Sequence, residues 1–210
     1  QPTEGRGTYA QGGKAYQMAN LVLDVGLKFG CRRVYTSGAA VAPIHHTMKS
    51  RVWVVPNRQE LLDEVKGYEN AILMSDIEGR GEEGSITGLN GLLLALAKKR
   101  GLESICLMGE IPDWLSGAIL PYPRASRSVL EVFAEILGIR IDFGFLDKME
   151  RQIDEIIESF YAKFPPEMKE EDDQRKLIAQ AKPGTITVQA QIYIDERFKK
   201  GGDEGGERPV

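Results

Sequence analysis

The residues best suited to binding an anion or a phosphate lie in the stretch 84–91, Gly-Ser-Ile-Thr-Gly-Leu-Asn-Gly. Thr87, Gly88, Asn90 and Gly91 stand where a loop enters a predicted helix, and the free backbone N–H groups at a helix N-terminus attract anions. The stretch lacks the Lys-Ser/Thr pair of a P-loop and the spacing of a dinucleotide-binding fingerprint. In the alternative interpretation, Thr87 caps the helix and the glycines allow it to pack closely on a strand. The pattern favours this structural role.

A second set of candidate ligand residues follows three predicted strands. Ligands of open parallel sheets bind beyond the carboxyl ends of the strands. If the three strands are neighbours, we therefore expect these residues to form a polar pocket. Almost every α/β protein offers such a pocket, so the pattern alone does not indicate catalysis. The set comprises Ser37, Ser75, Asp76, Gly109 and Glu110.

The two histidines, His45 and His46, are adjacent in the sequence. Side chains of adjacent residues on a strand point to opposite faces, so such a pair rarely binds one metal ion. With no cysteine or further histidine nearby, we predict no metal site. No Gly-x-Ser-x-Gly elbow occurs, and neither histidine can be assigned to a particular serine. We therefore predict no catalytic residue and no cofactor, and the sequence leans away from an enzyme.

The elements that must position these residues alternate between helices and short apolar strands across residues 1–144. The clearest helix runs from Thr87 to Gly101, and an earlier one carries an apolar stripe that we expect to face the core. Strands are predicted at 33–36, 51–55, 71–74 and 104–108. Such alternation is typical of an α/β fold with a mainly parallel, mixed sheet, here a three-layer α/β/α sandwich. The stripe consists of Met18, Leu21, Val22, Val25 and Phe29.

After this core domain, residues 145–166 are predicted to form one amphipathic helix. Its apolar seam can close over the domain's own sheet or contact a neighbouring subunit, and the sequence leaves both alternatives open. Residues 167–210 are predicted to form a charged segment with a strand at 185–194 and a disordered tail. The seam residues proposed for an oligomer or partner contact are Leu146, Met149, Ile153, Ile156 and Phe160.

Composition limits the classes of partner. The net charge of −4 and the pI near 5.4 argue against binding to nucleic acid or to an anionic membrane. No apolar run approaches the roughly 20 residues that span a bilayer. Cys31 and Cys106 are interpreted as buried thiols of a reducing compartment, with a disulfide or metal pair as the alternative, so we expect a cytoplasmic protein. The chain starts with Gln1 and not with Met, so we expect that this is not the native start.

The stretch 86–94, Ile-Thr-Gly-Leu-Asn-Gly-Leu-Leu-Leu, is followed by Arg100-Gly101 and by Ile-Cys-Leu-Met-Gly-Glu at 105–110. Together these motifs resemble the proteasome assembly chaperone family, whose archaeal and bacterial members were formerly labelled ATP-grasp-like. Weaker matches extend the likeness to about residues 1–145. The central motif is fairly specific.

The resemblance implies a phosphorylase/hydrolase-type fold, a homo-oligomer of three or more chains, and proteasome subunits or another protein as partner. It supplies no catalytic residues. Family members usually have a strand before the Gln-Pro that opens this chain, so we expect part of the family domain to be missing here. The sequence lacks the hydrophobic-Tyr-x ending that proteasome activators insert, so direct activation is not expected.

Two functions follow. The first is an oligomeric, non-catalytic protein that binds or chaperones other proteins. The alternative is a small-molecule or nucleotide-binding enzyme that uses the pocket at the strand ends, near Ser75, Gly88 and Glu110.

Overall fold

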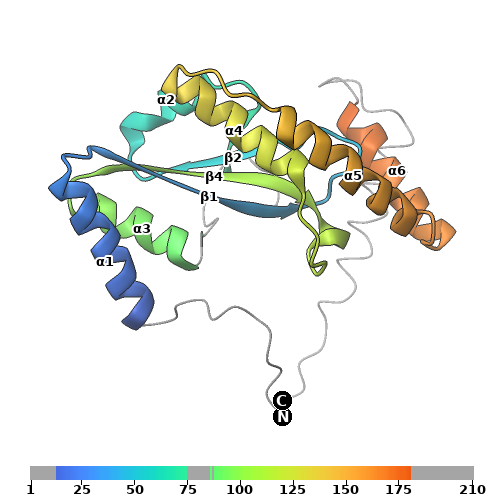
Figure 1. The fold of residues 1–210 in the computed structure, drawn as a ribbon, viewed down its shortest axis with the longest axis horizontal. Coiled ribbons are helices and arrows are strands. Elements are labelled where there is room, and N and C mark those ends of the chain that lie inside the picture. Colours follow the sequence, from blue (N-terminus) through green and yellow to red (C-terminus); the bar gives the residue numbers. More distant parts are fainter. Residues whose placement is uncertain (1–12, 75–85, 87, 181–210) are drawn as a thin grey trace, which may run out of the picture.

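A mixed sheet forms the centre of the molecule in a computed structural model, which describes residues 13–74, 86 and 88–180 (Figure 1). The strands are β1 (Arg33–Ala42), β2 (Val52–Pro56), β3 (Ala71–Leu73) and β4 (Glu103–Pro112), in the order β1-β4-β2-β3. β1 pairs with β4 and β2 with β3 in parallel, whereas β2 and β4 are antiparallel. The predicted α/β class and mixed, mainly parallel sheet are confirmed.

The pair of β1 and β4 is longer than predicted. Residues 37–40, Ser-Gly-Ala-Ala, were expected to form a loop because small residues have low strand propensity. In the structure they continue β1, with Ser37 opposite Leu107 and Ala40 opposite Glu110. Pairing with the apolar β4 overrides the local preference.

Helices cover both faces of the sheet (Figure 1). On one face, α4 (Pro123–Leu137), α2 (Leu62–Lys66) and the short 3-10 helix Gln59–Leu61 pack on the strands. On the other face lies α3 (Gly88–Lys99), and α1 (Gly13–Lys28) packs on α3. The first core consists of Val52, Val54, Leu61, Val65, Leu73, Ile105, Leu107, Val129 and Val132.

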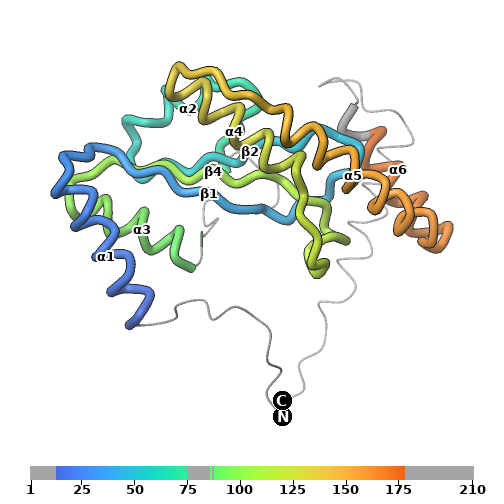
Figure 2. Tube along the Cα trace, in the orientation of Figure 1, coloured from blue at the N-terminus to red at the C-terminus, as the bar shows by residue number. Residues whose placement is uncertain are grey.

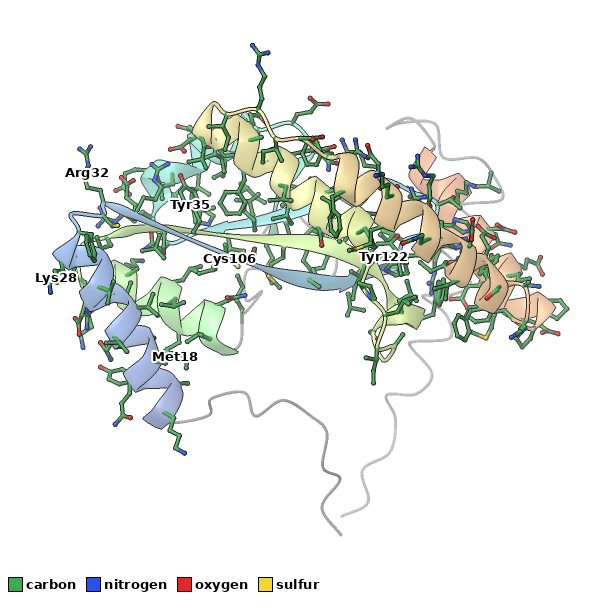
Figure 3. All side chains as sticks on the ribbon, in the orientation of Figure 1. Met18, Lys28, Arg32, Tyr35, Cys106 and Tyr122 are labelled. Carbon is green, nitrogen blue, oxygen red and sulfur yellow. The ribbon has the colours of Figure 1, made fainter. Side chains whose placement is uncertain are left out.

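The helix α1 packs with a different face from the one predicted. Ala15, Ala19 and Leu23 are buried at a four-residue spacing on one face of α1, and the two alanines let the helix approach α3 closely. The predicted core stripe from Met18 to Phe29 is exposed instead. The expectation of two buried thiols is also half wrong: Cys31 is exposed, whereas Cys106, labelled in Figure 3, is buried in the centre of the sheet.

Two helices follow the sheet domain. α5 (Gly144–Tyr161) confirms the predicted C-terminal helix, and its Ile153 and Ile157 are buried against Leu115 of the 3-10 helix Asp113–Leu115. α6 (Pro166–Gln180) occupies a segment predicted only to be charged. A proline in the first turn and an acid beside it, Glu167, are ordinary signals of a helix start. The predicted strand 185–194 lies outside the described residues.

Candidate functional site

The three predicted strand ends do not share one edge of the sheet. β2 turns back antiparallel to β4, so β3, which is parallel to β2, points opposite to β1 and β4. Val54 pairs with both Leu73 and Leu107, whereas Gly109 pairs with Val52. β3 therefore ends away from Glu110, and the condition for a pocket that unites the whole set is not met. Ser75 and Asp76 themselves lie outside the described residues.

Glu110 is a fully buried carboxylate inside β4, with all its bonds within the chain. The side chain of Arg51 donates to both its oxygens from Nε and to Oε1 from a terminal nitrogen, at 2.8–3.1 Å. The Arg51 backbone N–H donates to Oε2 at 3.1 Å, and Trp53 Nε1 donates to Oε1 at 2.7 Å. Burying a charge costs free energy unless hydrogen bonds and an opposite charge compensate it. Here both are present, and Glu110 fastens β2 to β4.

The glycines of the predicted anion site have structural roles, one in backbone conformation and one in packing. Gly88 begins α3 with φ of +71°, which favours glycine. A Cβ on Gly91 would lie 1.9 Å from the backbone oxygen of Ile86, so no larger residue fits. Asn90 Nδ2 donates to the Ser37 backbone oxygen at 3.1 Å and ties α3 to β1. Thr87 lies outside the described residues. These contacts explain the pattern without a ligand.

Gly109 has a similar role on the opposite face. Its Cβ would lie 2.8 Å from the backbone oxygen of Ala125, which shows how closely α4 rests on β4. Beside this contact runs a groove of about 470 Å³ between β1 and α4. Ser37 and Gly38 line it, but most of the lining is apolar, including Val129 and Phe133. Such a surface suits an apolar protein segment better than a charged metabolite.

Seven large apolar side chains are exposed on α1 or directly after it, and we call this surface the outer face of α1. Leu21 is 64% exposed and Phe29, just after the helix, 79% exposed. In Figure 3, Met18 marks the first half of this helix and Lys28 its end. Contiguous apolar surface of this kind marks interaction sites. The exposed members are Tyr16, Met18, Leu21, Val22, Val25, Leu27 and Phe29.

The seam proposed for α5 is divided between interior and surface. Ile153 is buried, and Met149 packs beside it within the chain's own core. Leu146 is half-buried, whereas Ile156 and Phe160 are exposed. The structure thus places part of the seam in the domain and leaves part of it accessible.

His45 and His46 do not lie on a strand, so the argument against a shared ion does not apply to them. They lie in the loop after β1, with their ring centroids 4.2 Å apart, and both are buried. Among the described residues, Asp172 of α6 joins them in a group whose ligand atoms lie within 4.8 Å of one another. Sequence analysis missed Asp172 because no local pattern connects it with the histidines.

Electrostatics distinguish the two rings. Burial lowers the pKa of His45, and the adjacent His46 lowers it further. Burial also lowers the pKa of His46, but the carboxylates of Asp172 and Glu158 outweigh it and raise that pKa above its ordinary value. His45 is therefore the more readily neutral ring.

No helix in the described part of the chain combines the length and the apolar character that crossing a membrane requires.

Three relatives place this architecture among known proteins. The chain is 32% identical over 169 residues to the uncharacterised protein MJ1210 of Methanocaldococcus jannaschii, covering 80% of this chain and 57% of the relative. The crystal structure of Pyrococcus furiosus PbaB, an archaeal proteasome activator, matches with a TM-score of 0.60 and 28% identity. That match covers 70% of this chain and 58% of PbaB.

Pyrococcus furiosus PbaA, described as an archaeal homolog of proteasome-assembly chaperone, matches in fold with a TM-score of 0.56 and 23% identity. The match covers 79% of this chain and 65% of PbaA. The chain thus spans less than two-thirds of each of these relatives. Residues 10–160, which include the sheet domain and nearly all of α5, match the model of the PAC2 family. The chain therefore belongs to the PAC2 family.

Proposed function

We propose that this protein is a non-catalytic, oligomeric member of the PAC2 family that binds proteasome-related proteins. Family membership and the 28% identity to PbaB, a proteasome activator, support a partner of this class. The polar groups that sequence analysis considered for catalysis also have other uses. Glu110 is held by Arg51 and Trp53, and the glycines of α3 support close packing.

The observation that carries the proposal is the outer face of α1. A helix on the surface of a monomer normally presents polar residues to water. Here the inward face carries Ala15, Ala19 and Leu23, and large apolar side chains such as Leu21 and Val25 are exposed to water. Leaving these side chains in water forgoes roughly 25 cal/mol for each Å² that a partner could cover. We infer that a second copy of the chain covers this face and that the oligomer, a trimer or larger, presents a joint surface to the proteasome subunit.

Size-exclusion chromatography with light scattering tests the oligomer. The wild-type chain is expected to elute as a multimer. The double variant Leu21→Glu/Val25→Glu, with charges one helical turn apart on the exposed face, is expected to elute as a folded monomer. Ile139→Glu, at an exposed apolar residue after α4, serves as the matched control and is expected to remain a multimer. A monomeric wild type at tens of micromolar would contradict the proposal.

Partner binding is tested separately, by titrating purified proteasome α-subunits with the wild-type chain and the double variant. Binding by the wild type and loss in the variant are expected if the oligomer presents the surface. A multimer that binds no proteasome subunit would retain the oligomer and reject the partner.

A further inference from the structure

Three segments from distant parts of the chain meet at the end of the sheet where β1 finishes. The loop after β1 brings His45 and His46, α5 brings Glu158, and α6 brings Asp172. In Figures 1 and 2, α6 lies beside α5 at this end of the molecule. The contact is independent of the outer face of α1 and of the proposed function.

The atoms at the centre of this contact are buried and have no hydrogen-bond partner among the described residues. His45 is 3% exposed, His46 4% and Asp172 3%. His45 Nε2 lies 3.6 Å and His46 Nδ1 3.7 Å from Asp172 Oδ2, which is too long for hydrogen bonds. Among the described residues, neither these nitrogens nor either Asp172 oxygen has a hydrogen-bond partner. Buried polar groups are almost always paired in native proteins, so three such residues facing one another need an explanation.

Two of the three separations between these atoms are close to the edge length of a metal coordination polyhedron, and the two nitrogens lie within 4.8 Å of each other. Zinc binds histidine nitrogen and carboxylate oxygen at about 2.0–2.2 Å in tetrahedral geometry, which places neighbouring ligand atoms roughly 3.4 Å apart. The two measured distances, 3.6 and 3.7 Å, lie within a few tenths of an ångström of this value. A cation between the three atoms would give each of them a bond.

The outer partners of the rings have the arrangement found around metal-binding histidines. His46 Nε2 lies 3.0 Å from Glu158 Oε1, so its N–H donates to a carboxylate and leaves Nδ1 bare toward the centre. His45 Nδ1 lies 2.8 Å from Thr47 Oγ1, and donation to this hydroxyl leaves Nε2 bare. The Thr47 backbone N–H also approaches His45 Nδ1, at 3.2 Å, and favours the opposite tautomer. Metal binding at Nε2 would favour the tautomer in which His45 Nδ1–H donates to Thr47 Oγ1, the shorter of the two contacts.

Charges around the centre favour a cation. Besides Asp172, the carboxylate of Asp173 lies 3.5 Å from His45 Nε2, on the exposed side where a fourth ligand or a water could complete the shell. Arg175 brings a positive charge to 3.9 Å from Asp172 Oδ1, but it pairs more closely with Asp113, at 2.9 Å. Lys176 is a second nearby cation, and its charge lowers the pKa of His45. With Glu158 included, three carboxylates surround the centre against these two cations.

We propose that His45, His46 and Asp172 form a binding site for a divalent transition-metal ion, best suited to Zn²⁺, that fastens α6 to the loop after β1. Two imidazoles and one carboxylate are a ligand set for zinc and similar ions rather than for Ca²⁺ or Mg²⁺. The site also explains how a polar helix is held in place. Between Pro166 and Leu177, Asp172 is the only buried side chain in the described part of α6.

Calorimetric titration of the tag-free chain with Zn²⁺ tests the proposal. One equivalent is expected to bind, and Co²⁺ in its place is expected to give the visible absorption of a tetrahedral site. Asp172→Asn is expected to weaken zinc binding at least tenfold. Glu170→Gln, an exposed acid on the same helix, is the matched control and is expected to bind like the wild type.

Glu158→Gln provides a second variant if Asp172→Asn fails to fold, because Glu158 is largely exposed and acts only through His46. Loss of such an outer partner lowers metal affinity about 10- to 100-fold. A wild-type chain that takes up no zinc at tens of micromolar would overturn the proposal and favour a simple pair of His46 imidazolium and Asp172. Undiminished binding by folded Asp172→Asn would place the ion elsewhere and also overturn it.

Discussion

Two buried carboxylates, one in the sheet and one on the last described helix, show how differently the same chemical group can be used in this fold. Glu110 in the sheet is 0% exposed and receives bonds from Arg51 and Trp53. Asp172 on α6 is 3% exposed, yet neither oxygen has a hydrogen-bond partner in the described part of the chain. The sequence pointed to Glu110 and overlooked Asp172. Burial of a charged group therefore indicates a binding site only when the group lacks hydrogen-bond partners within the chain.

The largest expected effect concerns Glu110. Replacing it with alanine leaves the Trp53 N–H and the Arg51 guanidinium without their acceptor, so the free energy of unfolding should fall by about 3 kcal/mol. Urea denaturation of the variant and the wild type measures this difference. Asp172→Asn in the metal-free chain is the matched comparison and should change stability by less than about 1 kcal/mol, because its oxygens accept no hydrogen bond from the described residues. Equal losses in both variants would abolish the distinction between the two carboxylates.

The second effect is the response to ligands. A hundredfold excess of Zn²⁺ over its dissociation constant should stabilise the wild type by about 2.7 kcal/mol. For a chain of this length that corresponds to a rise in Tm of roughly 5–10 °C. Thermal unfolding with and without zinc measures it, and Asp172→Asn should lose the rise.

Nucleotides and phosphorylated metabolites provide the contrasting ligands in the same assay. They should leave Tm unchanged, because the glycines near Gly88 serve packing. A clear rise with any of them would revive the alternative of a nucleotide-binding enzyme, and its loss in a folded Gly88→Val variant would locate that site.

The smallest effect belongs to a third carboxylate, Glu64, which is only partly buried. Arg33 donates to both its oxygens, and this pairing holds the pKa of Glu64 below its ordinary value of 4.5. A lowered pKa means that the pair stabilises the protein above pH 4.5 and that the gain is lost as the pH falls through the folded-state pKa. Glu64→Gln should therefore cost less than about 1 kcal/mol at pH 7 and still less at pH 3. Urea unfolding at both pH values checks the sign, and a larger cost at pH 3 would refute it.

Local patterns predicted the elements of this fold better than their orientation. Strand positions such as 104–108 and the helix α3 follow from apolar spacing, which the sequence displays directly. The direction of β2 does not, because an antiparallel return depends on a loop that carries no clear signal. That one reversal places the end of β3 away from the ends of β1 and β4.

The prediction of which helix face is buried was wrong for a related reason. Sequence analysis assigned the large apolar residues of α1 to the core, but the close contact with α3 uses Ala15, Ala19 and Leu23. A helix with two apolar faces does not indicate which one packs within the chain. On α6, the helix itself was missed, and the role of Asp172 depends on a loop far away in the sequence. Both departures occur where we propose binding, as expected for residues that local consistency does not explain.

Anomalous diffraction at the zinc absorption edge, from crystals of the tag-free chain grown with Zn²⁺, tests the central distinction most directly. If zinc binds at the proposed site, one anomalous peak is expected about 2 Å from His45 Nε2, His46 Nδ1 and an Asp172 oxygen, with none at Glu110. No peak between the histidines, and a direct hydrogen bond from His46 to Asp172 instead, would contradict it.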